Sequence, residues 1–79
     1  MIDAKKIEEL ISRKTELLAE TEVYIAIGDF ISSNTNRCKN EWNYSELVAW
    51  INALNDVMAK LKNIDSELED ILKQLKEMG

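Results

Sequence analysis

Leucine recurs at every seventh position through the second half of the chain, and this repeat restricts the fold more than any other feature. The repeating residues are Leu47, Leu54, Leu61, Leu68 and Leu75. An apolar repeat sustained over about five heptads predicts one long helix whose apolar side packs against a partner. The rows three residues before and three residues after these leucines are also mainly apolar. A stripe of three rows is wider than the seam of a two-stranded coiled coil and is typical of helical bundles.

The start of this helix is marked by two polar residues. Asn43 is a favourable N-cap, because its side chain can accept a hydrogen bond from a free backbone N–H of the first turn. Glu46 follows three residues later and completes the pattern of a capping box. We therefore predict this helix over about residues 44–78.

Another helix is predicted before it. Asp3 is placed to act as the N-cap, and apolar residues keep helical spacing from there to Ile31. The segment that follows is rich in Ser, Asn and Thr, whose side chains compete with helical hydrogen bonds. We therefore predict the first helix over about 3–33 and a loop over about 34–43.

Together these elements predict an all-α fold, a hairpin of two long antiparallel helices in a single domain over residues 1–79. Composition agrees, because a chain with no proline and only two glycines has few of the residues that form the turns of a sheet. A domain of 79 residues buries a small core and is commonly stabilised by association. We expect the hairpin to dimerise into a four-helix bundle.

The position of the loop also predicts the register of the hairpin. If the chain reverses near Cys38 and Lys39, Leu10 lies level with Leu68. The same register places Gly28 near Trp50, where the missing side chain of the glycine leaves room for the indole.

Two charged residues, Lys14 and Asp65, each interrupt an apolar row, and this register brings them together. We predict a structural ion pair between them, which would fix the register more than it would stabilise the fold. The alternative interpretation is that Asp65 belongs to a functional site.

The chain offers little catalytic or metal-binding chemistry. It contains no histidine and one cysteine, which excludes histidine-based acid–base catalysis and zinc sites built from Cys and His. No glycine-rich phosphate loop is present. Clusters of carboxylates on a helix are better explained as solvated faces than as metal sites. We therefore expect no catalytic residue, no bound metal and no cofactor, and we do not expect an enzyme.

The one cysteine, Cys38, lies between Arg37 and Lys39. Neighbouring cations can lower the pKa of a thiol and make it more reactive. Because no base or oxyanion site accompanies it, we expect a free thiol in the loop.

The net charge of -5 at pH 7 argues against direct binding to nucleic acid, since nucleic-acid-binding domains usually carry a basic surface. No apolar run approaches the roughly 20 residues that a membrane span requires, and charged residues near the N-terminus argue against a signal peptide. We expect a soluble, cytoplasmic protein that does not bind membranes.

More apolar residues occur near the predicted loop than a two-helix hairpin can bury. The predicted contact residues are Val23, Ile27, Phe30, Trp42, Tyr44, Val48 and Trp50. Two interpretations are open: the patch forms the contact with a second copy of the chain, or its aromatic residues anchor a different protein. We prefer self-association, and the two uses are compatible.

The sequence therefore favours a small protein-interaction module, such as an adaptor, assembly factor or regulator, that acts as a helical homo-oligomer. A second hypothesis is an acidic decoy that occupies the nucleic-acid site of a basic protein. A decoy requires carboxylates concentrated on one face, whereas each predicted helix mixes acidic and basic residues. The interaction module is the preferred hypothesis.

Overall fold

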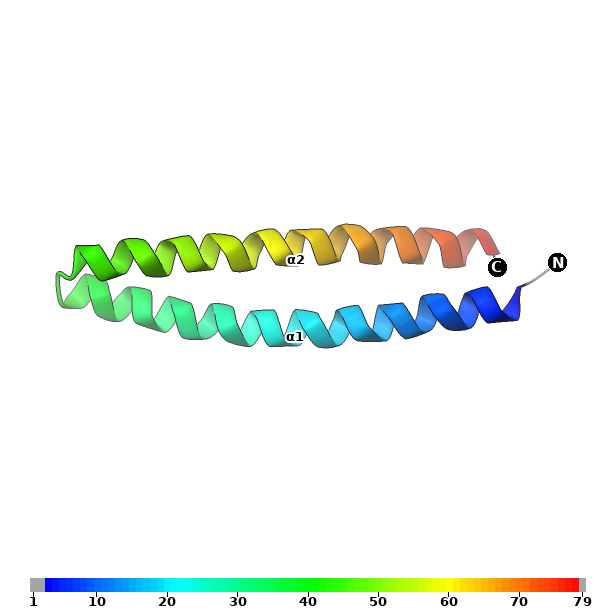
Figure 1. Cartoon of the computed structure of the whole chain (residues 1–79), viewed down its shortest axis with the longest axis horizontal. Coiled ribbons are helices and arrows are strands. Elements are labelled where there is room, and N and C mark those ends of the chain that lie inside the picture. Colours follow the sequence, from blue (N-terminus) through cyan, green and yellow to red (C-terminus); the bar gives the residue numbers. More distant parts are fainter. Residues whose placement is uncertain (1–2, 79) are drawn as a thin grey trace.

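The structure is a computed structural model that describes residues 3–78. It contains two helices, α1 (Ala4–Asn40) and α2 (Tyr44–Met78), which run antiparallel and side by side (Figure 1). Their Cα atoms span 62 × 15 × 13 Å, so the molecule is a rod with the turn at one end and Ala4 and Met78 at the other. The predicted all-α helical hairpin is confirmed.

The start of α1 follows from its N-cap. The Asp3 carboxylate accepts a hydrogen bond from the Lys6 backbone N–H at 3.2 Å, as the sequence predicted. This bond satisfies one of the backbone donors that the first turn of a helix leaves without a partner.

The predicted end of the first helix is wrong, because α1 continues for seven more residues to Asn40. The polar segment does not break the helix: Asn34 and Thr35 donate side-chain hydrogen bonds to carbonyls one turn earlier, at 3.0 and 2.9 Å. Ile31, just before this segment, and Cys38, within it, are buried. Packing of these residues against α2 therefore outweighs the weak helix propensity of the polar residues.

Residues 41–43 connect the helices in a compact turn, which replaces the longer predicted loop. The Asn43 N–H donates to the Cys38 carbonyl at 2.9 Å, and the Trp42 N–H donates to the Lys39 carbonyl at 3.3 Å. These bonds form the Schellman pattern that ends many helices. The pattern needs a left-handed residue, and Trp42 supplies it with φ of 58°. Glycine usually occupies this position, so the tryptophan costs about 1 kcal/mol of backbone strain.

The predicted start of α2 at Tyr44 is confirmed. Asn43 Oδ1 accepts a hydrogen bond from the Glu46 backbone N–H at 3.3 Å. The Glu46 carboxylate accepts in return from the Asn43 side-chain amide at 3.0 Å, rather than from the backbone N–H of a standard capping box. That backbone N–H closes the turn, so Asn43 both ends α1 and starts α2.

The core is a line of apolar side chains between the two helices. On α1 the buried residues share one seven-residue row: Leu10, Leu17, Ile31 and Cys38. On α2 the deepest row lies three residues after the leucines and comprises Val57, Ile64 and Ile71. Within the leucine row only Leu47 is buried, and the other four leucines are half-buried. One hairpin therefore covers only part of the apolar stripe of α2.

The helices are aligned one heptad away from the predicted register. A Cβ atom built on Gly28 would lie 3.9 Å from Val57, seven positions beyond the predicted neighbour Trp50. The Trp50 indole instead lies edge-on to Phe30, with the ring centroids 5.7 Å apart. The shift follows from the turn, because the chain reverses at Trp42 rather than four residues earlier.

Candidate interaction surface

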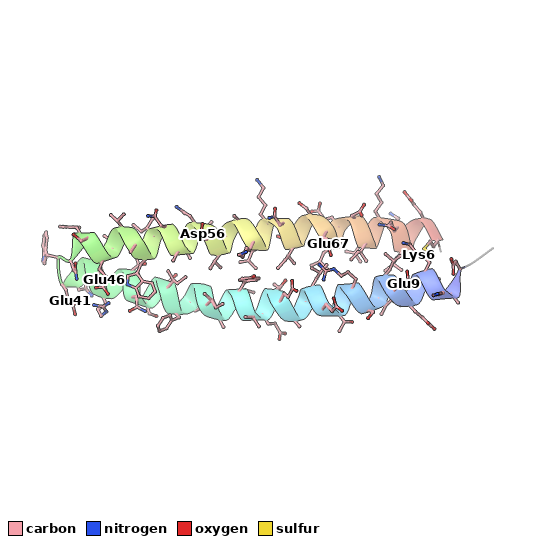
Figure 2. All side chains as sticks on the ribbon, viewed as in Figure 1. Lys6, Glu9, Glu41, Glu46, Asp56 and Glu67 are labelled. Carbon is pink, nitrogen blue, oxygen red and sulfur yellow. The ribbon has the colours of Figure 1, made fainter. Side chains whose placement is uncertain are left out.

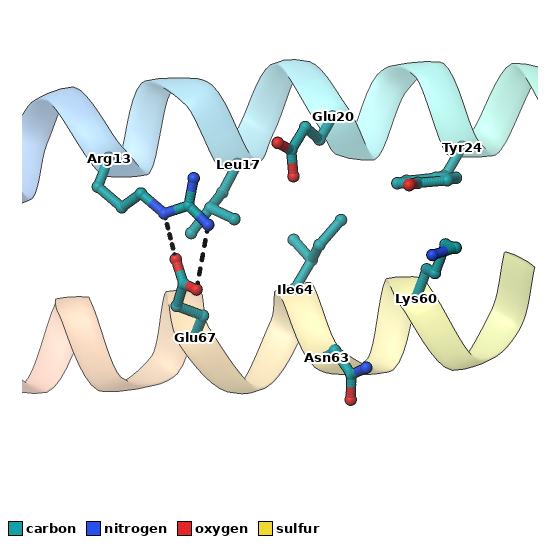
Figure 3. A pocket seen from close by; sticks show the side chains of 8 residues that line it. All are labelled: Arg13, Leu17, Glu20, Tyr24, Lys60, Asn63, Ile64 and Glu67. Carbon is teal, nitrogen blue, oxygen red and sulfur yellow. Dashed lines mark hydrogen bonds and ion pairs between the residues drawn. The ribbon is translucent and has the colours of Figure 1, made fainter.

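The contact between the two helices has two long edges, along which the residues next to the buried rows are exposed to solvent. One edge is marked by Arg13 of α1 and Glu67 of α2, which form an ion pair across the hairpin (Figure 3). Arg13 Nη2 donates to Glu67 Oε1 at 3.2 Å, and Arg13 Nε donates to Glu67 Oε2. We call this side the polar edge, and its rows are Arg13, Glu20 and Ile27 on α1 and Glu46, Ala53, Lys60, Glu67 and Gln74 on α2.

A shallow groove of about 210 Å³ lies along the polar edge (Figure 3). Its lining is Arg13, Leu17, Glu20, Tyr24, Lys60, Asn63, Ile64 and Glu67. The hydrogen bonds to Glu67 and then to Glu16 raise the pKa of Arg13, and the bond from Arg13 lowers the pKa of Glu67. Both groups therefore keep their charges at neutral pH, and the pair links the helices without being suited to proton transfer.

The opposite edge is apolar. Since the rows of Arg13 and Glu67 meet on one side of the core, the rows that flank the core on its other side meet on the opposite edge. We call this side the apolar face, and it comprises Ile11, Leu18 and Ile25 of α1 with Tyr44, Val48, Ile51, Met58 and Leu72 of α2. These side chains are 40–59% exposed. This group of half-exposed apolar side chains, which Asp65 interrupts on α2, is more extensive than the isolated apolar residues of ordinary protein surfaces.

Figure 2 shows the side chains of both helices, and most of the charged residues are exposed. The predicted pair of Lys14 and Asp65 does not appear among the ion pairs of residues 3–78, in which Arg13 and Glu67 join the helices at a nearby level. Asp65 is exposed and interrupts the α2 row of the apolar face, whereas Lys14 is half-buried beside the core.

The predicted contact residues do not form one patch. Three of them lie on the polar-edge side of α1: Val23, Ile27 and Phe30. Two others, Tyr44 and Val48, lie on the apolar face. Trp50 is half-buried and packs edge-on against Phe30. Trp42 is 75% exposed at the tip of the turn, and its ring contacts only that of Tyr44 among the aromatic residues.

Most of the apolar face was not predicted from the sequence. Six of its residues were not among the predicted contact residues: Ile11, Leu18, Ile25, Ile51, Met58 and Leu72. A signal was present, because α1 carries two adjacent apolar rows at seven-residue spacing. A single neighbouring helix can cover only one of two such rows in full.

Glu46 links the two helices at the turn. Its carboxylate accepts hydrogen bonds from Arg37 at 2.8 Å, from the Cys38 thiol at 3.3 Å and from the Trp50 indole at 3.4 Å. These donors lower the pKa of Glu46, and the bond from Arg37 has the largest effect. The carboxylate thus holds residues of α1 and α2 in one hydrogen-bonded cluster.

Cys38 lies within α1 and is fully buried, so its predicted position in a loop is wrong. Burial raises the pKa of the thiol, and the hydrogen bond to Glu46 raises it further, while Arg37 opposes both only in part. The neighbouring cations therefore do not activate this thiol at neutral pH.

Within residues 3–78, no group of three His, Cys, Asp or Glu side chains is arranged to hold a metal ion. Neither α1 nor α2 has the unbroken apolar length that a membrane crossing requires. The chain matches no protein-family model, and no curated protein or solved structure is similar enough to count as a match.

Proposed function

We propose that this protein is a small non-catalytic interaction module that works as a homo-oligomer, in which two hairpins form a four-helix bundle. The observation that carries the proposal is the apolar face, a strip of about half-exposed side chains along both helices. Removing apolar surface from water contributes about 25 cal/mol per Å². A second helical surface laid on this strip would therefore stabilise both partners.

A second copy of the chain is the simplest partner for the apolar face. A contact 62 Å long and 15 Å wide covers roughly 900 Å² of each copy, close to the roughly 800 Å² per partner of a standard protein interface. Two-fold pairs are the commonest assemblies of identical chains. A domain this small also gains from a core shared between two copies.

Assembly through the apolar face leaves other apolar residues for a different protein. Val23, Ile27 and Phe30 are 40–63% exposed on the polar-edge side, and Trp42 projects from the turn. Exposed aromatic side chains of this kind often anchor protein contacts. The module would thus be an adaptor or assembly factor in the cytoplasm, where reducing conditions keep Cys38 as a thiol.

The test is a charge placed on the apolar face. Ile51→Glu puts a carboxylate within the proposed contact, whereas Asn52→Glu adds the same charge on an exposed position that points away from it. In sedimentation equilibrium across a wide dilution range, we expect the wild type and Asn52→Glu to associate and Ile51→Glu to be monomeric. A wild type that is helical and monomeric at every concentration would contradict the proposal, as would unchanged association of Ile51→Glu.

A further inference from the structure

The residues that border the apolar face differ in charge between the two helices. On α1 the bordering row is Glu8, Thr15, Glu22 and Asp29, and on α2 it continues from Val48 of the apolar face through Asn55, Lys62, Glu69 and Lys76. The α1 border carries only negative charge, whereas the cations of the α2 border are Lys62 and Lys76. These charged side chains are exposed, and none takes part in an ion pair within residues 3–78.

Two hairpins can stack by their apolar faces about a two-fold axis in either of two ways. With the axis along the rod, α1 of one copy lies over α2 of the other, and the two turns are at the same end. With the axis across the rod, each helix lies over its own counterpart, and the turns are at opposite ends. The second arrangement would place two acidic α1 borders against each other, which is unfavourable.

The first arrangement also matches the charges level by level. Within one hairpin, Gly28 is level with Val57, so Glu22 is level with residue 63 and Glu8 with residue 77. A two-fold axis along the rod preserves these levels between copies. Glu22 of one copy then lies beside Lys62 of the other, and Glu8 lies beside Lys76. Each pair occurs twice in the dimer because of the symmetry.

We infer that the partner on the apolar face is a second copy with its turn at the same end, α1 stacked on the partner's α2, and Glu8–Lys76 and Glu22–Lys62 pairs along the border. This inference rests on the proposed homo-oligomer and adds its orientation. The charge pattern selects the orientation, while the apolar side chains supply most of the attraction.

The first experiment is disulfide cross-linking. In a Cys38→Ser background, the variants Glu22→Cys and Lys62→Cys are purified separately, reduced, mixed and oxidised. We expect the mixture to give the mixed 22–62 dimer, with little dimer from either variant alone. The other orientation predicts the reverse, because residue 22 lies near the middle of α1 and would meet itself. Self-linked Glu22→Cys without the mixed product would overturn the inference.

A second experiment uses charge reversal and does not alter Cys38. Glu22→Lys and Lys62→Glu should each raise the dimer dissociation constant about tenfold, and the double variant should restore it to within about threefold. Asp56→Lys and Lys73→Glu are matched controls on exposed rows outside the face, and they should leave it unchanged. Single reversals without effect would overturn the inferred orientation.

These outcomes separate the inference from the proposal beneath it. A wild type that does not associate would contradict the proposed homo-oligomer itself. The wild type could instead associate through Ile51 but neither cross-link nor respond to charge reversal as expected. That result would contradict only the inferred orientation of the two copies.

Discussion

Glu46 shows how one carboxylate can determine the geometry of a turn. It accepts hydrogen bonds from Arg37, Cys38, Asn43 and Trp50. The sequence predicted its role in the N-cap, since the spacing from Asn43 is a local pattern. It did not predict the bonds to α1, because the helix was expected to end before Arg37. A local pattern reveals a cap, but contacts across the turn depend on where both helices end.

The lowered pKa of Glu46 gives a prediction for Glu46→Gln. The folded-state pKa lies below the unfolded value, so the stabilisation is present above the unfolded pKa and is lost as the pH falls through the folded pKa. We expect the variant to melt below the wild type at pH 7 and the difference in Tm to shrink as the pH falls through the folded-state pKa. The measurement is thermal unfolding followed by circular dichroism. Asp56→Asn, an exposed carboxylate, is the control, and a difference in Tm that stays constant with pH would contradict the prediction.

The turn is the element in which sequence and structure differ most. From the sequence, the polar segment after Ile31 is predicted to form a loop, because Ser, Asn and Thr are weak helix formers. Propensity alone cannot detect that Cys38 continues the buried row of Leu10 and Leu17. The start of α2 was predictable from its cap, whereas the end of α1 depends on packing against another helix.

Trp42 occupies the left-handed position of this turn, so Trp42→Gly should relieve backbone strain. We expect the free energy of unfolding to rise by up to about 1 kcal/mol, because the exposed indole contributes little burial and glycine tolerates positive φ. Urea unfolding measures this change. Trp50→Gly is the control, and it should destabilise the fold because its indole is half-buried against Phe30 and bonded to Glu46. Clear destabilisation by Trp42→Gly would mean that its ring supports the turn.

At the scale of the whole molecule, the sequence predicted the hairpin but misplaced its register by one heptad. Leucines every seven residues specify which side of α2 is inward, yet they allow the neighbouring helix to slide by seven residues and meet an equivalent layer. The position of the turn decides between such registers. Because the turn was predicted too early in the chain, Gly28 was expected beside Trp50, whereas it lies beside Val57. The apolar face was not predicted for a related reason. Which apolar rows of a helix stay exposed can be assigned only when the position of the neighbouring helix is known.

If two hairpins share their apolar faces, folding and association are linked. We expect the Tm of the wild type to fall by about 4 °C for each tenfold dilution, because dilution favours the dissociated chains. Circular dichroism melts over a thousandfold concentration range provide the measurement. Ile51→Glu, which should not associate, should show a Tm independent of concentration. A wild-type Tm that does not change with dilution would contradict this linkage.

Ala4, where α1 begins, and Met78, where α2 ends, lie together at the end of the rod opposite the turn, and the rod is 62 Å long. A fluorescent protein or surface tether fused at Ala4 or at Met78 would therefore emerge at the same end and leave Trp42 unobstructed. In the inferred pair, both tips would also point the same way, so a client with two binding sites could engage them together. Such two-point attachment gains from a high effective concentration even when each tip binds weakly.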